Sequence, residues 1–433
     1  MARNRVIYQS EALFVGPVAG GENDEHHQIT RVQDISHDMT LNRTDIFEFG
    51  RLAALDRVVL DTPTVTLDFS YLLTNGHNED AMGMLVVGRG SNSITENVAG
   101  GLFEGNSGGG AGTCGQFLSG LSNNVDADAE KNFYVVTTEE EKDADDDTAS
   151  TTWDGSTFNA RSIVGFGNGV ISNYSVNAAV GDFASASVSV DAYNVAFISG
   201  QPNGKTDSWV SGAQVPSVDK TKTACLTSAS FDLPVATSGK NRIFAIRPGD
   251  IEVQFFTGAN ELSTTAENGK LQGIGGAILP TEDPDTTTEG ADTGEPMHIQ
   301  NFSIDAPLAR TPLQRIGSSF PYFRPIDYPQ DCTFNVSALL ADVTTGSMTE
   351  LICGEGGYDI VVKLRVPCAD CDGIGEDDNV MAYKLKNARL ASQNFGATIG
   401  DAKTVDLSFV GTYDSKLGTD NGLYISGTAD FAS

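Results

Sequence analysis

Apolar and polar residues alternate in two separate stretches of the chain, 173–190 and 392–409. In the first, NYSVNAAVGDFASASVSV, two alternating runs flank Gly181-Asp182, and in the second, SQNFGATIGDAKTVDLSF, they flank Gly400-Asp401. Such alternation is typical of strands with one buried face, and a Gly-Asp pair between them favours a two-residue turn. We therefore predict two equivalent β-hairpins, related by a shift of 400 − 181 = 219 residues.

A second correspondence aligns residues 32–73 with 299–340 without a gap, at a shift of 299 − 32 = 267 residues. Both correspondences occur in the same order in the two halves, so an internal duplication with a longer insert in the first half is the economical interpretation. The identical pairs are Gln33/Gln300, Ser36/Ser303, Asp38/Asp305, Leu41/Leu308, Arg43/Arg310, Thr44/Thr311, Gly50/Gly317, Arg57/Arg324, Thr66/Thr333, Ser70/Ser337, Leu72/Leu339 and Leu73/Leu340.

Each half opens with a predicted strand, at 32–42 and 299–309. In the first half we predict a short helix next, with Thr44 as its N-cap and its apolar face packed in the core. The residues at near-helical spacing are Ile46, Phe49, Leu52 and Leu55. In the second half the corresponding helical pattern is weakened by three prolines, Pro312, Pro321 and Pro325.

Alternating runs predict the remaining strands. One face of a strand holds Val65, Leu67, Phe69 and Tyr71, and Phe334, Val336 and Ala338 take the same place in the second half. Further strands are predicted at 131–137, 251–256, 358–366 and 381–390. The fold class is therefore all-β, with two tandem antiparallel β-sandwich or barrel domains, short flanking helices and acidic loop inserts. We divide the chain into residues 1–215 and 216–433, because the Gly/Ser/Thr-rich stretch 200–222 shows no alternation.

Charge narrows the possible functions. The formal net charge is −31, from 58 acidic and 27 basic residues, so the surface as a whole repels DNA and anionic lipid. The acid clusters in segments almost without large apolar residues, 139–147, 280–296 and 376–379, which we interpret as solvated loops. The first residues lack the apolar core of a secretory signal, and no run is long enough to span a bilayer, so we expect a protein made in the cytoplasm.

Three local patterns suggest binding chemistry, and each is incomplete. GQPNGKT at 200–206 has three residues between its glycines where a phosphate loop needs four, which favours a linker. Cys368 and Cys371 have the spacing of half a zinc site or of a redox pair, but proline and loop residues flank them. The acidic runs 126–130 and 143–147 lack the glycine and distal glutamate of a calcium loop. We predict no metal and no cofactor.

The cysteines and histidines also fail to form a recognisable site. The six cysteines, Cys114, Cys225, Cys332, Cys353, Cys368 and Cys371, are too dispersed for a disulfide scaffold, and we expect reduced thiols. His26 and His27 lie in a polar segment, and no serine or cysteine stands in a nucleophile motif. Two carboxylates on different loops remain free to meet in space. We predict no enzymatic activity and name no catalytic, cofactor-binding or metal-binding residue.

The segment 43–73, together with 167–195, 246–253 and 383–409, resembles the major tail tube proteins of tailed bacteriophages. The resemblance implies β-sandwich or β-barrel domains with a flanking helix that assemble into rings, which stack into a hollow tube for genome ejection. It implies a place in the virion tail, with tape measure, terminator and baseplate proteins as partners and with DNA passing through the lumen without specific binding. Because simple tail tube subunits have one domain and form rings of six, a two-domain chain implies a trimeric ring with pseudo-sixfold symmetry. A hexameric ring remains an alternative.

Two other function classes stay open. A secreted or surface-layer β protein that binds calcium would need an export signal. A glycan-binding or hydrolytic protein would need an aromatic cleft, and the chain has only Trp153 and Trp209, both in polar surroundings. The long Gly-rich span 89–130 is a candidate for contacts between rings.

Overall fold

The computed structural model describes most of the alternating segments that the sequence suggests. The residues it describes are 11–17, 25–40, 43–59, 64–87, 121, 130–137, 162–199, 213–214, 225–226, 230–232, 246–257, 298–317, 320–339, 357–365, 379–396, 404–413 and 421–428.

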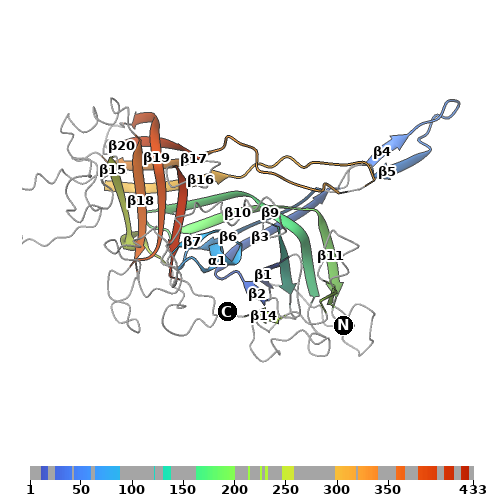
Figure 1. The fold of residues 1–433 in the computed structure, drawn as a ribbon, viewed down its shortest axis with the longest axis horizontal. Coiled ribbons are helices and arrows are strands. Elements are labelled where there is room, and N and C mark those ends of the chain that lie inside the picture. The colour runs from blue at the N-terminus through green and yellow to red at the C-terminus, as the bar shows by residue number, and fades with distance from the viewer. Residues whose placement is uncertain are drawn as a thin grey trace, which may run out of the picture.

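The described structure is nearly all β (Figure 1). The first half contains β1 (Glu11–Pro17), β2 (Glu25–Gln28), β3 (Val32–Thr40), β4 (Arg43–Ile46), β5 (Asp56–Val59), β6 (Thr64–Leu72), α1 (His77–Ala81), β7 (Val86–Val87), β8 (Lys131–Thr137), β9 (Ser162–Ala179), β10 (Ser185–Ala192), β11 (Asn194–Ser199) and β12 (Ala213–Gln214). The second half contains β13 (Cys225–Leu226), β14 (Ser230–Asp232), the 3-10 turn Pro248–Asp250, β15 (Ile251–Thr257), β16 (His298–Pro307), β17 (Asp331–Leu339), β18 (Tyr358–Arg365), β19 (Asn379–Gly396), β20 (Thr404–Thr412) and β21 (Gly422–Gly427).

Eight of these strands form one antiparallel sheet in the order β3–β6–β10–β9–β16–β17–β20–β19. The first four come from the first half and the last four from the second. We call this the main sheet. Each half adds a second layer, β1–β8–β9–β11 in the first and β15–β18–β19–β21 in the second. Each half is therefore a two-layered antiparallel β-structure.

The strand registers repeat between the halves. The pair Val32↔Tyr71 becomes Ile299↔Ala338 at the shift of 267, and the bulge falls at Gln33 in one half and at Gln300 in the other. Likewise, β9–β10 and β19–β20 share one register at the shift of 219, with bulges at residues 172 and 391. Because a β-bulge shifts every later pair, matching bulges show that the two correspondences in sequence are also correspondences in space.

The strands β9 and β19 connect the two layers of their halves. Residues 162–167 of β9 pair with β11 and residues 170–177 pair with β10, and a left-handed residue, Asn168 (φ 53°), stands between. Asn387 (φ 54°) takes the same place in β19. Asparagine tolerates this backbone conformation better than most residues, so each long strand turns from one layer to the other at an asparagine.

The core lies between the layers and is built from the predicted alternating faces. Val65, Leu67, Phe69 and Tyr71 are buried, as are Phe334, Val336 and Ala338. The predicted strands 131–137, 251–256 and 358–366 are confirmed as β8, β15 and β18, and 381–390 is part of the longer β19.

A polar cluster lies inside this core. The hydroxyls of Tyr71 and Tyr174 donate to Oε1 of Glu79, at 2.7 and 3.0 Å, and the hydroxyl of Tyr383 lies 2.7 Å from that of Tyr174. Tyr383 belongs to the second half, so this network joins the two halves. Burial, above all, raises the pKa of Glu79.

Two local predictions are wrong. Residues 44–55 form no helix; they belong to the β4–β5 hairpin, and Ile46, Phe49, Leu52 and Leu55 are exposed rather than packed in the core. The turn after β9 is also longer than two residues, since β10 starts only at Ser185 and Val180 is exposed. The N–H of Val180 donates to Gln300 of β16 instead of continuing the hairpin ladder. Contacts with a neighbouring strand therefore override the local turn signal.

The boundary at residue 215 stays a prediction, as does the second predicted turn at Gly400-Asp401, which lies outside the described residues. The described helices are too short to cross a membrane.

Candidate assembly interface

The two halves meet at a strand pair in the middle of the main sheet. β9 and β16 pair antiparallel, with Phe302 opposite Ala178, Ile304 opposite Val176 and Ala306 opposite Tyr174. All six side chains are buried. We call this pair the internal junction. In the order of the main sheet, it joins the last strand of the first half to the first strand of the second half.

The two outer strands of the main sheet are the same two strands of the repeat. β3 is the counterpart of β16, and β19 is the counterpart of β9, but each has a main-sheet neighbour on one side only among the described residues. Met39 is 40% exposed where its counterpart Ala306 is 0% exposed. Phe395 is 43% exposed where its counterpart Val176 is 0% exposed. Unpaired strand edges with exposed apolar side chains are sites for pairing with another chain.

Each half also carries a hairpin between the first two strands of its repeat, which we call hairpin 1 (residues 43–59) and hairpin 2 (residues 310–326). Their registers agree: Arg43↔Val59 corresponds to Arg310↔Ile326, and Ile46↔Asp56 corresponds to Leu313↔Phe323. The bond from Leu55 N–H to the Ile46 carbonyl recurs from Tyr322 to Leu313, and Gly50 and Gly317 both have a positive φ, 90° and 93°. The hairpins are therefore equivalent in backbone structure.

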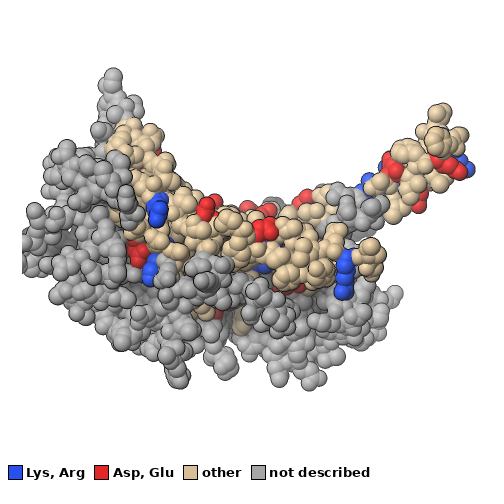
Figure 2. Space-filling model, turned by 45° about the horizontal axis from the view of Figure 1, so that its top comes forward, with Lys and Arg blue, Asp and Glu red and all other residues tan. Residues whose placement is uncertain are grey.

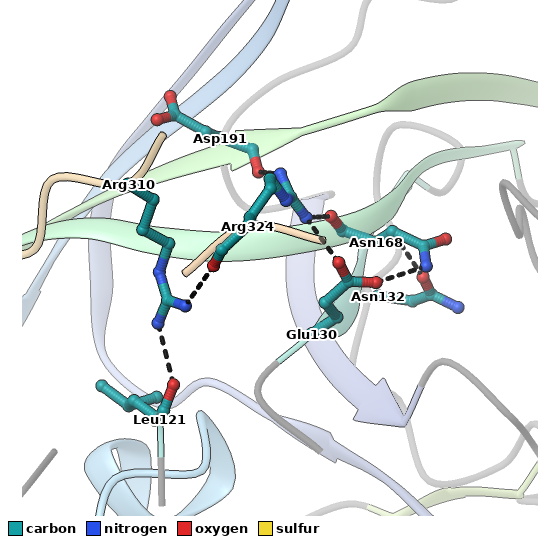
Figure 3. Close-up of polar contacts among 7 residues, drawn as sticks. All are labelled: Leu121, Glu130, Asn132, Asn168, Asp191, Arg310 and Arg324. Atoms are coloured by element: carbon teal, nitrogen blue, oxygen red, sulfur yellow. Dashed lines mark hydrogen bonds and ion pairs between the residues drawn. The ribbon is translucent and has the colours of Figure 1, made fainter. Parts of the chain in front are cut away.

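Hairpin 2 docks on the first half through Arg324 (Figure 3). Its guanidinium donates to the Asp191 carbonyl of β10 at 2.9 Å, to the Asn168 carbonyl of β9, and to Glu130 Oε1 at 3.2 Å. It also lies 3.7 Å from the centre of the Tyr193 ring. A buried arginine with carbonyl, carboxylate and aromatic partners has most of its desolvation cost offset.

The acceptor side of this contact is held rigid by its own bonds (Figure 3). Asn168 donates from its side chain to Glu130 Oε2 at 2.7 Å, and its N–H donates to Asn132 Oδ1 at 2.9 Å. The left-handed backbone at Asn168 thus presents a fixed carbonyl to Arg324.

A second arginine of hairpin 2 strengthens the dock. Arg310 donates to the Arg324 carbonyl at 3.1 Å and to the Leu121 carbonyl at 2.8 Å. Burial, and then the charge of Arg324, lower the pKa of Arg310 to about 10, so it remains protonated at neutral pH. The two arginines bind hairpin 2 to the first half alongside the internal junction.

Hairpin 1 makes no such contact with the other residues that the structure describes, and it projects away from the body (Figures 1 and 2). Phe49 and Leu52 at its tip are 107% and 106% exposed. Arg57, the counterpart of Arg324, is exposed and pairs with Asp45 of the same hairpin at 2.8 Å.

The second face of the main sheet has an unusual composition. On its six inner strands, β6, β10, β9, β16, β17 and β20, the positions between the buried ones carry Ser, Thr, Asn and Asp, with a few apolar residues near the strand ends and no lysine or arginine. The acidic members are Asp68, Asp191, Asp305, Asp331 and Asp406. The inner strands of this face are therefore short-chained, polar and without positive charge, whereas Arg389 lies on the same face at the outer strand β19. The six inner strands offer no cationic side chain to attract a phosphate.

The motifs considered for chemistry fall largely outside the described residues. These include 200–206, Cys368 and Cys371, the run 143–147, both tryptophans and the Gly-rich span except for Leu121 and Glu130. Cys332 is described, and burial raises the pKa of its thiol to about 12, so it is protonated and unreactive. The described residues contain no group of three His, Cys, Asp or Glu side chains placed to hold a metal ion.

Sequence reasoning missed the importance of the arginines. Arg43/Arg310 and Arg57/Arg324 were among the identical pairs of the two halves, and two basic pairs in so acidic a chain were the available signal. The wrong helix prediction hid this signal, because a helix does not place the two arginines of each half on the two strands of one hairpin.

No family model and no curated protein matches the chain. Among solved structures, the anti-feeding prophage baseplate matches at a TM-score of 0.25 and 10% identity, covering 41% of this chain and 92% of the other. The anti-feeding prophage tube-terminating cap matches at 0.20 and 13%, covering 29% and 87%. A crystal structure of Hcp protein matches at 0.21 and 12%, covering 41% and 98%. Scores this low carry no argument about function.

Proposed function

We propose that this protein is a tail tube subunit of a phage-like particle, which closes into rings that stack into a hollow tube for DNA. The observation that supports the proposal best is the relation between the internal junction and the free edges. β9 and β16 show how one repeat joins the next, and β19 and β3 are the same two strands without their partners. Repetition of one head-to-tail contact around a closing rotation generates a ring.

The register of the contact between chains follows from the internal junction. Subtracting 267 from β16 residues and adding 219 to β9 residues turns Asp305↔Ser175 into Asp38↔Asn394, and Ile304↔Val176 into His37↔Phe395. In this pairing Met39 lies opposite Gln393, and Met39 and Phe395, half-exposed in one chain, become covered. The pairing also removes both open edges of the sheet.

A ring of three chains has the size that a DNA conduit needs. Eight main-sheet strands from each chain give 24, and at a spacing of about 4.8 Å and a tilt of roughly 40° they close a wall about 50 Å across. With this polar face turned inward, each chain would present six inner strands without lysine or arginine, and Arg389 of β19 would be the exception on its main-sheet strands, so the wall would bind the phosphates of passing DNA only weakly. Six chains would double the width.

Negative-stain electron microscopy and mass photometry of the purified chain at rising concentration test the proposal. Three chains of 45.7 kDa give a ring of about 137 kDa, the expected result. Rings of twice that mass would overturn the threefold symmetry but not the tube. A protein that stays monomeric at every concentration would contradict the proposal itself.

A further inference from the structure

We propose that hairpin 1 of each chain docks on the second half of the neighbouring chain in the ring, with Arg57 taking the place that Arg324 takes within one chain. This inference rests on the proposed ring. The binding partner of hairpin 1 is therefore a second copy of this protein. The contact repeats the one that hairpin 2 makes with the first half of its own chain.

Topology places hairpin 1 at the right site. Hairpin 2 follows β16 and docks on the half whose β9 pairs with β16. Hairpin 1 follows β3, so once β3 pairs with β19 of another copy, it lies beside that copy's second half. The equivalent registers of the two hairpins then put Arg57 where Arg324 lies.

The second half carries the matching acceptors. The carbonyls of Asn168 and Asp191 correspond, at the shift of 219, to those of Asn387 and Val410. Asn387 has the same left-handed backbone as Asn168, and its N–H donates to Asp359 Oδ1 at 2.7 Å, as Asn168 donates to Asn132. The change from Asp191 to Val410 leaves the main-chain acceptor in place, so the site does not depend on that side chain.

Two parts of the internal dock have no counterpart, and this difference predicts a weaker contact. Glu130 corresponds to Gly357, and Tyr193 corresponds to Thr412. Hairpin 1 instead brings its own carboxylate, because Asp45 pairs with Arg57 and stands where hairpin 2 has Pro312. The contact between chains thus has fewer interactions than the internal one, as suits an association that forms after folding.

The docked part of the hairpin is its base, not its tip. Ile316, at the tip of hairpin 2, stays 106% exposed although hairpin 2 is docked. Its counterpart is Phe49. Phe320, in contrast, lies 6.0 Å from the Tyr193 ring and corresponds to Ala53. Ala53 is therefore expected to lie against the neighbouring chain, and Phe49 is not.

The first test compares two arginines of hairpin 1. Arg57→Ala should raise the concentration for half-maximal ring formation, measured by mass photometry, about tenfold or more, because charge-assisted bonds to carbonyls are lost. Arg51→Ala removes the same charge from the tip, where Arg51 makes a long contact of 3.7 Å with Glu48. This substitution should change the concentration for half-maximal ring formation less than about twofold. For Arg57→Lys, the concentration for half-maximal ring formation should lie between the values for Arg57→Ala and Arg51→Ala.

The second test locates the contact. A benzophenone amino acid at residue 53 should crosslink, in rings, to peptides around Asn387 or Thr412 of another copy, and the same amino acid at residue 49 should not. If wild-type rings form but Arg57→Ala behaves like Arg51→Ala, or residue 53 captures no such peptide, the docking is wrong and the ring stands. If no variant, wild type included, forms rings, the proposed function has failed and the docking with it.

Discussion

β16 and β3 occupy the same position in the two repeats, yet β16 is flanked on both sides and its apolar face is covered. Within the described part of the chain, β3 has a neighbouring strand on one side only. The same contrast holds for β9 and β19 and for the two hairpins. Sequence differences do not account for it, since Met39 and Phe395 are larger apolar residues than the buried Ala306 and Val176. The contrast teaches that exposure here reflects the position of a strand in the chain, and that a second copy can supply the missing neighbour.

The largest expected effect separates folding from assembly at equivalent positions. Val176→Asp places a carboxylate in the covered internal junction, which costs several kcal/mol and should unfold the chain. Phe395→Asp, at the open edge, should leave a folded monomer but raise the concentration for ring formation at least about a hundredfold, because the carboxylate would be buried only when two chains pair. Circular dichroism and mass photometry measure the two outcomes. Equal effects of both substitutions on folding would contradict the distinction between the internal junction and the open edge.

The two equivalent arginines should differ in the same way. Arg324→Ala leaves Glu130 and two carbonyls without a buried cation, so it should lower the free energy of unfolding of the monomer by about 3 kcal/mol. Arg57→Ala should change it by no more than about 0.5 kcal/mol, because Arg57 is exposed. Urea denaturation of dilute, monomeric protein provides both values, and a large loss for Arg57→Ala would show that hairpin 1 already has a partner within its own chain.

The buried carboxyl near the internal junction should make folding depend on pH. Because burial raises the pKa of Glu79 in the folded state, its contribution to stability is full below its ordinary value of 4.5 and declines as the pH rises through the folded pKa. Glu79→Gln keeps an oxygen for Tyr71 and Tyr174 and cannot ionise, so its stability relative to wild type should increase, by on the order of 1 kcal/mol, as the pH rises above 4.5. The open edge lacks this network, since Gln393 stands in place of Tyr174.

A pH-independent difference between Glu79→Gln and wild type in denaturation would contradict that assignment. Tyr71→Phe is a useful second variant, because it removes one donor to Glu79 without changing the number of ionisable carboxylates.

Salt should have the smallest effect, and it should act on the contact between chains. Each chain carries a formal charge of −31, so rings form against mutual repulsion, which is screened beyond about 10 Å at 0.1 M salt. The concentration for ring formation should fall a few-fold between about 0.05 and 0.5 M sodium chloride. Mass photometry across that range checks this, and inhibition by salt would instead indicate ion pairs as the main contact.

Much of the fold could be predicted from the sequence, because alternation reports burial directly. The faces of β6 and β17 and the positions of β8, β15 and β18 follow from it. The gapless correspondence at 267 even contained the bulge, since Gln33 and Gln300 are an identical pair at that site. Sequence patterns of residues that pack in the chain's own core therefore predicted the strands correctly.

The predictions failed for residues whose side chains do not pack in that core. Ile46, Phe49, Leu52 and Leu55 fit a helical period, but they belong to a hairpin whose apolar residues lie outside the body of the chain. A periodicity argument assumes that apolar residues pack within the same molecule. The dock of Arg324 could not be predicted either, because the atoms that accept its hydrogen bonds on the first half belong to residues 133 to 194 positions away along the chain.

The most direct test of the account is a disulfide between the two open edges. Asp38→Cys with Asn394→Cys should give chains linked to one another, under mild oxidation of assembled protein, and Asp34→Cys with Asn394→Cys should not. Asp305→Cys with Ser175→Cys, at the equivalent pair of the internal junction, should form a bond within one chain whether or not rings are present. If the internal pair forms and the edge pair never links two chains at any concentration, the edges do not repeat the internal junction and the account is wrong.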